Sequence, residues 1–158
     1  MTRDNMATLI LDVPLEAQTK SNTCWHAAAS MIWFYWQKVG GRQGPMFTIV
    51  DHWVKNQAVS PEDFIVLARN VGLMEVPRSQ QYSSDSLKSI IEEHGPVWCA
   101  GWWYGPGHVI VLAGVDGEAI HINDPDGGVR KKELVGWFNS KLANQLPGCL
   151  MCKDPGRY

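Results

Sequence analysis

Asn22-Thr23-Cys24-Trp25, with Gln18 six residues before the cysteine, is the stretch from which both fold and chemistry can be inferred. From Cys24 to about Val39, apolar residues recur at helical spacing, and Gly40-Gly41 stops the pattern. The asparagine or threonine before the cysteine is a suitable N-cap, so we expect a helix with Cys24 in its first turn. Unpaired backbone amides and the helix dipole stabilise a thiolate there, which is the nucleophilic form of cysteine.

Two later segments supply the partners that a nucleophilic cysteine needs. Gly107 to Leu112 places His108 at the head of an apolar strand, and the next apolar run ends in Asp124. Asp116-Gly117 between the two runs is a strong hairpin signal, so we expect adjacent antiparallel strands. With the turn at that position, His108 and Asp124 are near-opposite. We therefore expect His108 to accept the thiol proton and Asp124 to orient the imidazole.

Asn123 is the alternative third member of this group. Its side chain should point to the opposite face of the strand from Asp124, because side chains alternate along a strand. A metal site is not expected. Cys149 and Cys152 form a single C-x2-C, and two further ligands at suitable spacing are not evident. We expect no cofactor, and we interpret these two cysteines as part of a closing strand.

Composition limits the remaining possibilities. The chain has 158 residues and fits one domain, residues 1–158, whose core can support itself. A net charge of −2 with 19% charged residues gives no basic patch for nucleic acid. The N-terminal apolar run is too short for a signal peptide, and nothing approaches a membrane span. Four cysteines without a signal peptide indicate a reduced compartment, so we expect a soluble protein that is cytoplasmic in the producing cell.

The remaining periodicity predicts an α+β fold, with helices first and a sheet second. Beyond the cysteine-bearing helix, we expect further helices at about 60–70, 84–94 and 133–142, and strands at 97–103, 108–115, 119–123 and 149–152.

In the residues proposed for catalysis, the chain resembles the papain-like cysteine peptidases, and within them the small bacterial C39-like and C70-like peptidases. The matching residues are Gln18, Cys24-Trp25, His108 and Asp124-Pro125, in the family's order, and the pattern covers roughly residues 14 to 125. The resemblance implies a nucleophile helix packed on a C-terminal antiparallel sheet. It also implies a cysteine protease that works through a thioester, with Gln18 donating to the oxyanion hole beside the Cys24 backbone N–H.

The resemblance extends to substrate and partners. C39-like relatives favour small residues, such as paired glycines, before the scissile bond, which implies a narrow subsite here. We expect Trp25, Trp103, Tyr104 and Gly107 to contact the substrate, because aromatic side chains beside a nucleophile commonly line a cleft. The substrate would be a protein. Relatives of this size resemble secreted effectors or toxins that are delivered to another cell and restrained by an immunity or inhibitor protein.

Two departures from the family concern substrate class. The sequence shows no propeptide or transporter domain such as larger relatives carry, and Ser21-Asn22-Thr23 replaces the glycine-rich surroundings of plant-type members. Three alternative functions remain at this point. The same triad can carry out glutamine deamidation or transglutamination, a cysteine-type cell-wall amidase would use related chemistry, and a catalytically dead peptide-binding module would use none.

Overall fold

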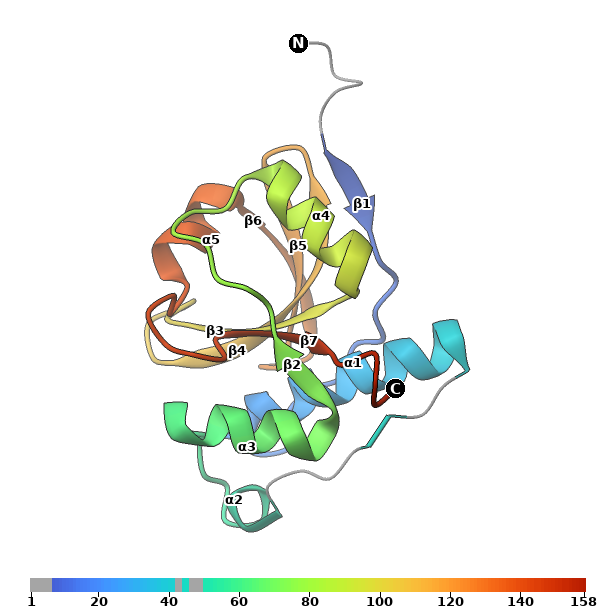
Figure 1. Ribbon diagram of the computed structural model, residues 1–158. Coiled ribbons are helices and arrows are strands. Elements are labelled where there is room, and N and C mark those ends of the chain that lie inside the picture. Colours follow the sequence, from blue (N-terminus) through green and yellow to red (C-terminus); the bar gives the residue numbers. More distant parts are fainter. Residues whose placement is uncertain (1–6, 42–43, 46–49) are drawn as a thin grey trace.

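The computed structural model describes residues 7–41, 44–45 and 50–158 (Figure 1). In chain order the elements are β1 (Thr8–Ile10), α1 (Cys24–Gly40), α2 (Val50–Val54), α3 (Pro61–Val71), β2 (Leu73–Glu75), α4 (Ser84–His94), β3 (Val97–Gly101), β4 (His108–Asp116), β5 (Ala119–Asp124), β6 (Val129–Leu134), α5 (Val135–Lys141) and β7 (Leu150–Lys153). Within the described ranges, no helix has the length and apolar character needed to cross a membrane.

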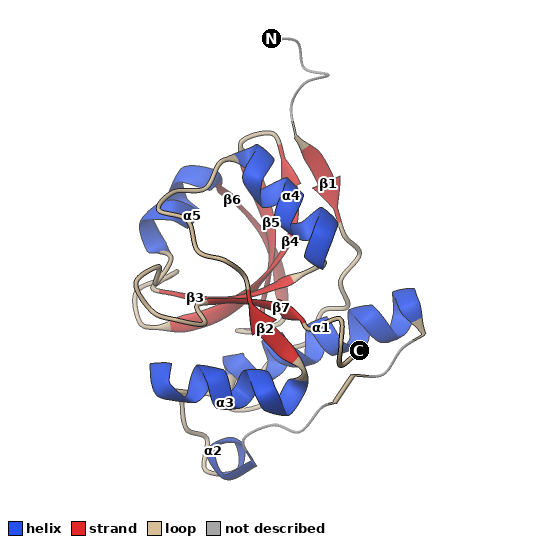
Figure 2. Cartoon of the chain, viewed as in Figure 1, coloured by secondary structure: helices blue, strands red, loops and turns tan. Residues whose placement is uncertain are grey.

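The strands form one antiparallel sheet in the order β2-β7-β3-β4-β5-β6, and β1 pairs with β4. In Figures 1 and 2, α1 and α3 lie on one side of this curved sheet, and α4 and α5 lie on the other. The α+β class is confirmed. The expected order of helices before strands is only partly right, because β1 and β2 come from the N-terminal half and join the same sheet.

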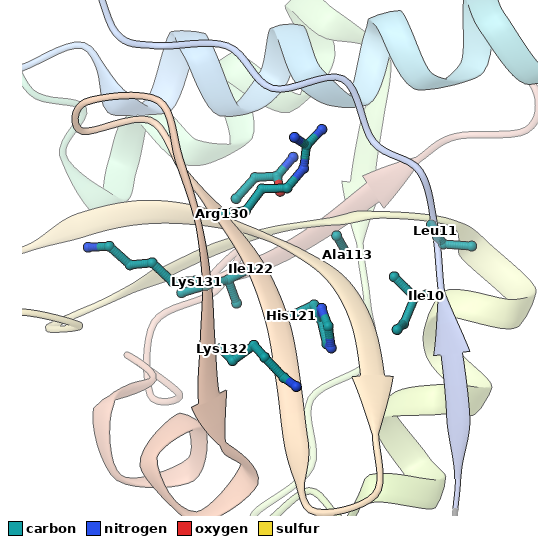
Figure 3. A pocket seen from close by; sticks show the side chains of 9 residues that line it. Ile10, Leu11, Ala113, His121, Ile122, Arg130, Lys131 and Lys132 are labelled. Atoms are coloured by element: carbon teal, nitrogen blue, oxygen red, sulfur yellow. The ribbon is translucent and has the colours of Figure 1, made fainter.

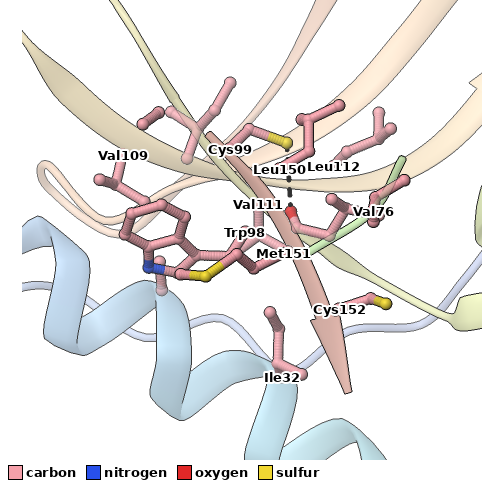
Figure 4. Packing of buried hydrophobic residues seen from close by; sticks show 14 of the residues in the cluster. Ile32, Val76, Trp98, Cys99, Val109, Val111, Leu112, Leu150, Met151 and Cys152 are labelled. Carbon is pink, nitrogen blue, oxygen red and sulfur yellow. Dashed lines mark hydrogen bonds between the residues drawn. The ribbon is translucent and has the colours of Figure 1, made fainter. Parts of the chain in front are cut away.

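Helices on both sides explain why the central strand β3 is a continuous apolar run. All five of its residues are buried, as is typical of a strand covered on both faces. Trp98 of β3 is fully buried, and its indole Nε1 donates to the main-chain oxygen of Trp25 over 3.1 Å. Figure 4 shows Trp98 beside Met151 of β7, above Ile32 of α1. This packing fixes the start of α1 against the middle of the sheet.

The helix ends follow local sequence signals. Gly41 and Gly72 adopt left-handed conformations with φ of 62° and 71°, and they end α1 and α3 where the sequence predicts. Helix α4 begins with a capping box in which Ser83 and Ser86 bond each other's backbone N–H. The predicted helix at 133–142 is shorter than expected, because its first residues belong to strand β6.

A β-bulge in β4 determines which side chains of the β4–β5 hairpin share a face. Near the turn, Gly114 pairs with His121, whereas Leu112 pairs with Ile122 and Val111 with Asn123, so one strand advances an extra residue at Ala113. If the register seen next to the turn continued without this bulge, Asp124 would lie opposite Val111 and on the other face of the sheet from His108. With the bulge, Asp124 shares a face with His108. The two residues are diagonal neighbours, in agreement with the near-opposite positions that the turn predicts.

Candidate active site

Cys24 is the first residue of α1, as the sequence predicts. Its thiol is free and partly exposed. Thr23 occupies the N-cap position without capping the helix through its side chain, and its Oγ1 donates instead to the main-chain oxygen of Lys20 over 3.0 Å. Cys24 therefore lies at the N-terminus of α1, where the partial positive charge of the first-turn amides favours an anion.

His108 and Asp124 meet at the ends of β4 and β5. His108 Nε2 lies 2.6 Å from Asp124 Oδ1, and the His108 imidazole also lies close enough to the Cys24 side chain for the two groups to interact. Because Nε2 contacts the carboxylate, Nδ1 is the ring nitrogen left for sulfur. The Asp124 side chain is 1% exposed, so its charge has to be balanced by protein groups instead of water. The structure thus brings Cys24, His108 and Asp124 together, with the imidazole between the thiol and the carboxylate.

These contacts change the titration of two groups. Burial would lower the pKa of His108, but hydrogen bonds to Asp124 and Cys24 outweigh it and raise the pKa to about 9. Burial would raise the pKa of Asp124, but its hydrogen bonds outweigh this and hold that pKa below the usual range. The imidazolium is therefore fully present below pH 6.5 and is lost as the pH rises through about 9.

Two further donors hold the Asp124 carboxylate. The backbone N–H of Asp126 donates to Oδ1 over 2.9 Å, and Lys131 Nζ donates to Oδ2 over 2.9 Å. Sequence reasoning missed Lys131, because β6 (Val-Arg-Lys-Lys-Glu-Leu) has no apolar alternation and was not predicted as a strand. The one available signal was the glycine-rich turn at 126–128, which could have suggested a third strand after β5.

Asn56 holds the loop that precedes the cysteine. Among the described residues it is the one non-glycine with positive φ, at 56°. Its Oδ1 accepts from the Asn22 backbone N–H over 2.8 Å, and its Nδ2 donates to Ser21 Oγ over 2.9 Å. Lys20 Nζ donates to the carbonyl of Trp53 over 2.9 Å. The segment around α2 therefore holds the loop before Cys24 in place by hydrogen bonds. No local sequence pattern indicated this role.

Gln18 lies at the same site. Its backbone N–H donates to Pro125 O over 2.8 Å, which joins the loop to the end of β5. Its side-chain Nε2 donates to the carbonyls of Lys20 and Ser21 over 3.0 and 2.8 Å, and Oε1 is buried without a hydrogen-bond partner among the described residues. The amide that was expected to serve an oxyanion is thus engaged by its own loop.

A cavity of about 450 Å³ opens beside these residues. Tyr104 and Gly107, two of the residues expected to contact the substrate, line it together with Gln18, Ser21, Asn22, Pro106, His108 and Asp126. Trp25 and Trp103 are corrections, since both are 1% exposed and belong to the core. The Trp25 indole N–H bonds the carbonyls of Asn22 and Gln57, and Trp103 stacks on Phe138 and donates to Cys99 O. Their polar edges are satisfied internally, so neither faces a substrate.

Asn123 points away from His108, as strand alternation predicts. It is 2% exposed, and its Nδ2 donates to Val13 O over 3.2 Å. It lines a second cavity of about 280 Å³, which Figure 3 shows between the N-terminal segment and β4–β6. Within the part of the chain that the structure describes, no group of three or more His, Cys, Asp and Glu residues could hold a metal ion.

Comparison with known proteins agrees with this arrangement. A family model described as the papain-like cysteine protease AvrRpt2 matches residues 8–143. The chain belongs to this family of papain-like cysteine proteases. It is therefore a cysteine peptidase, and the resemblance inferred from its sequence is confirmed.

A solved structure with a similar fold is the double glycine motif protease from an AMS/PCAT transporter, in complex with the leader peptide. It has 20% sequence identity to this papain-like protease and a TM-score of 0.55, and the match covers 90% of each chain. At this identity the likeness shows the fold alone. No curated protein sequence matches the chain.

Replacing Asp124 by asparagine should move the alkaline limb of activity. In the wild type we expect kcat/KM for a peptide substrate to fall as the pH rises through about 9, where His108 loses its proton. Asp124→Asn removes the charge that supports the imidazolium, so this limb should move to lower pH. The rate should fall on the order of 10-fold to 100-fold, as for loss of a buried charged hydrogen bond.

Asp116→Asn is the matched control. It removes the same charge from an exposed position at the other end of β4 from His108. We expect its pH profile to stay near that of the wild type. If the alkaline limb of Asp124→Asn stays where it is in the wild type, the Asp124 carboxylate does not raise the pKa of His108, and this part of the account is wrong.

Proposed function

We propose that Cys24 is the nucleophile of this protease, that His108 is its acid and base, and that Asp124 orients the imidazole. The observation that carries the proposal is the 2.6 Å contact between the His108 imidazole and the Asp124 carboxylate, with the Cys24 side chain close enough to interact with the same imidazole. The series lies beside a cavity of about 450 Å³ that His108 itself lines. A peptide in that cavity would present its carbonyl to the sulfur.

The chemistry follows from the placement of the proton. With the proton on His108, the Cys24 thiolate attacks the peptide carbonyl carbon and forms a C–S bond, and the carbonyl electron pair becomes an oxyanion. Collapse of this intermediate breaks the C–N bond, and the imidazolium gives its proton to the leaving amine. His108 then takes a proton from water, whose oxygen attacks the thioester. Cleavage of the C–S bond releases the carboxylic acid and restores the Cys24 thiolate beside the protonated His108.

Gln18 and the Cys24 backbone N–H are the proposed donors to the oxyanion. The Gln18 amide lines the cavity and is held near the end of β5 through its backbone bond to Pro125. Both of its Nε2 hydrogens contact loop carbonyls, so the substrate oxygen has to replace one of these partners. The developing negative charge is a stronger acceptor than a neutral carbonyl and favours that exchange.

Removing the Gln18 amide should slow the chemical step. We expect Gln18→Ala to lower kcat on the order of 100-fold to 1,000-fold, because one oxyanion donor is lost, with a smaller change in KM. The measurement is steady-state hydrolysis of a peptide substrate. Thr19→Ala, an exposed neighbour in the same loop, is the control and should retain activity. Equal rates for Gln18→Ala and the wild type would remove Gln18 from the oxyanion site.

We propose a protein substrate with small residues, such as paired glycines, before the scissile bond. Support comes from the resemblance to C39-like peptidases and from a cavity that Tyr104 and Pro106 line next to Gly107. A panel of peptides differing at these two positions should show faster cleavage with glycine, and no cleavage by Cys24→Ala. Equal acceptance of bulky residues would exclude a narrow subsite. Conversion of glutamine to glutamate with the chain intact would favour deamidation instead.

We also propose that the protein acts as an effector or toxin in another cell and is restrained by an immunity or inhibitor protein in the producer. This part rests on the resemblance to small bacterial peptidases of that kind. Production of the wild-type protein inside a susceptible cell should arrest growth, and production of Cys24→Ala at the same level should not. Equal growth with both proteins would contradict the proposal.

A further inference from the structure

Strand β6 carries three consecutive basic residues that do not point the same way. In Figure 3, Arg130 and Lys132 extend to one side of the strand and Lys131 extends to the other. Arg130 donates to Val13 O over 3.2 Å, and Lys132 Nζ lies 3.9 Å from Asp116 Oδ2. Lys131 alone of the three contacts the proposed triad. Lys132 carries the same charged group on the other side of the strand and can therefore serve as its control.

The contact of Lys131 with Asp124 differs from an ordinary surface ion pair. The Lys131 side chain is 35% exposed, but its partner is 1% exposed. Exposed pairs contribute little, whereas removing one partner of a buried carboxylate leaves a charge without compensation. Because His108 and the Asp126 N–H share Oδ1, the ammonium on Oδ2 holds the second oxygen. A carboxylate held at both oxygens cannot rotate away from the imidazole.

Lys131 also contacts the wall of the cleft. Its Nζ lies 4.0 Å from the centre of the Tyr104 ring, within the range of a cation–π interaction. The Tyr104 hydroxyl lies 3.5 Å from Glu133 Oε2, two residues further along β6 on the same side as Lys131. One lysine therefore joins the third member of the proposed triad to a residue that lines the substrate cavity.

We propose that Lys131 is a positioning residue for catalysis: it fixes the orientation and the negative charge of Asp124, and holds Tyr104 at the cleft. The inference rests on the proposed triad and deepens it. Lys131 does not touch the reacting atoms, and it acts through Asp124 on His108.

The test is kcat/KM for a peptide substrate as a function of pH in the wild type, Lys131→Met, Lys131→Arg and Lys132→Met. Lys131→Met should lower the maximum roughly 10-fold to 100-fold, as expected when a buried charge loses a partner. Its acid limb should move to higher pH, because removing the ammonium makes Asp124 easier to protonate. Lys131→Arg keeps the positive charge, so its rate and the position of its acid limb should both be close to those of the wild type. Lys132→Met should resemble the wild type.

Two results would overturn the proposal. An acid limb that does not move in Lys131→Met would mean that Lys131 has only a structural role. An equal shift in Lys132→Met would mean that any loss of positive charge from β6 has the same effect. Thermal unfolding of each variant checks its fold. If Lys131→Met does not fold, Lys131→Gln replaces it in the test, because glutamine keeps a hydrogen-bond donor without the charge. The acid limb of Lys131→Gln must then still lie at higher pH than that of the wild type. Failure of the triad itself looks different. In that case His108→Ala would keep the rate and pH profile of the wild type.

Discussion

The hydrogen bond between His108 and Asp124 is the interaction on which the site depends, and a bulge in β4 makes it possible. Side chains alternate along a strand, so a shift of one residue moves a whole set to the other face. The extra residue at Ala113 supplies that shift, and it brings Asp124 to the face of His108. Without it, the register at the turn would leave the two residues on opposite faces of the sheet.

Cys24, the proposed nucleophile, is brought to this pair by contacts between residues far apart in sequence. Trp98 holds the start of α1 against β3 by its bond to Trp25 O, and Gln18 ties the preceding loop to the end of β5 through Pro125 O. Asn56 adopts a positive φ to bond both the backbone and a side chain of the same loop. Helix, loop and hairpin are thus fixed to one another, and the chemistry requires this because a small misplacement of reacting groups lowers the rate strongly.

Much of this arrangement could be predicted from sequence because its signals are local. The N-terminal position of Cys24, the strand that begins at His108 and the hairpin at 116–117 all follow from short patterns. The bulge lies in a run of apolar residues whose one local sign of it is Gly114, since an isolated glycine in a strand can mark either a bulge or the close approach of another backbone. Lys131 belongs to an edge strand whose charges look like ordinary solvated residues. Trp25 and Trp103 are buried in the core, where the carbonyls of Gln57 and Cys99 accept their indole N–H groups, and no composition rule shows where a tryptophan finds that partner.

The central claim is that Cys24 and His108 form an ion pair, and alkylation of Cys24 as a function of pH tests it most directly. In the wild type we predict rapid alkylation well below pH 8.5, the approximate titration point of a free thiol, because His108 holds the proton. In His108→Ala, alkylation should follow a single titration near that ordinary value. The three buried cysteines should react slowly in both proteins. One titration near 8.5 in both proteins would contradict the account.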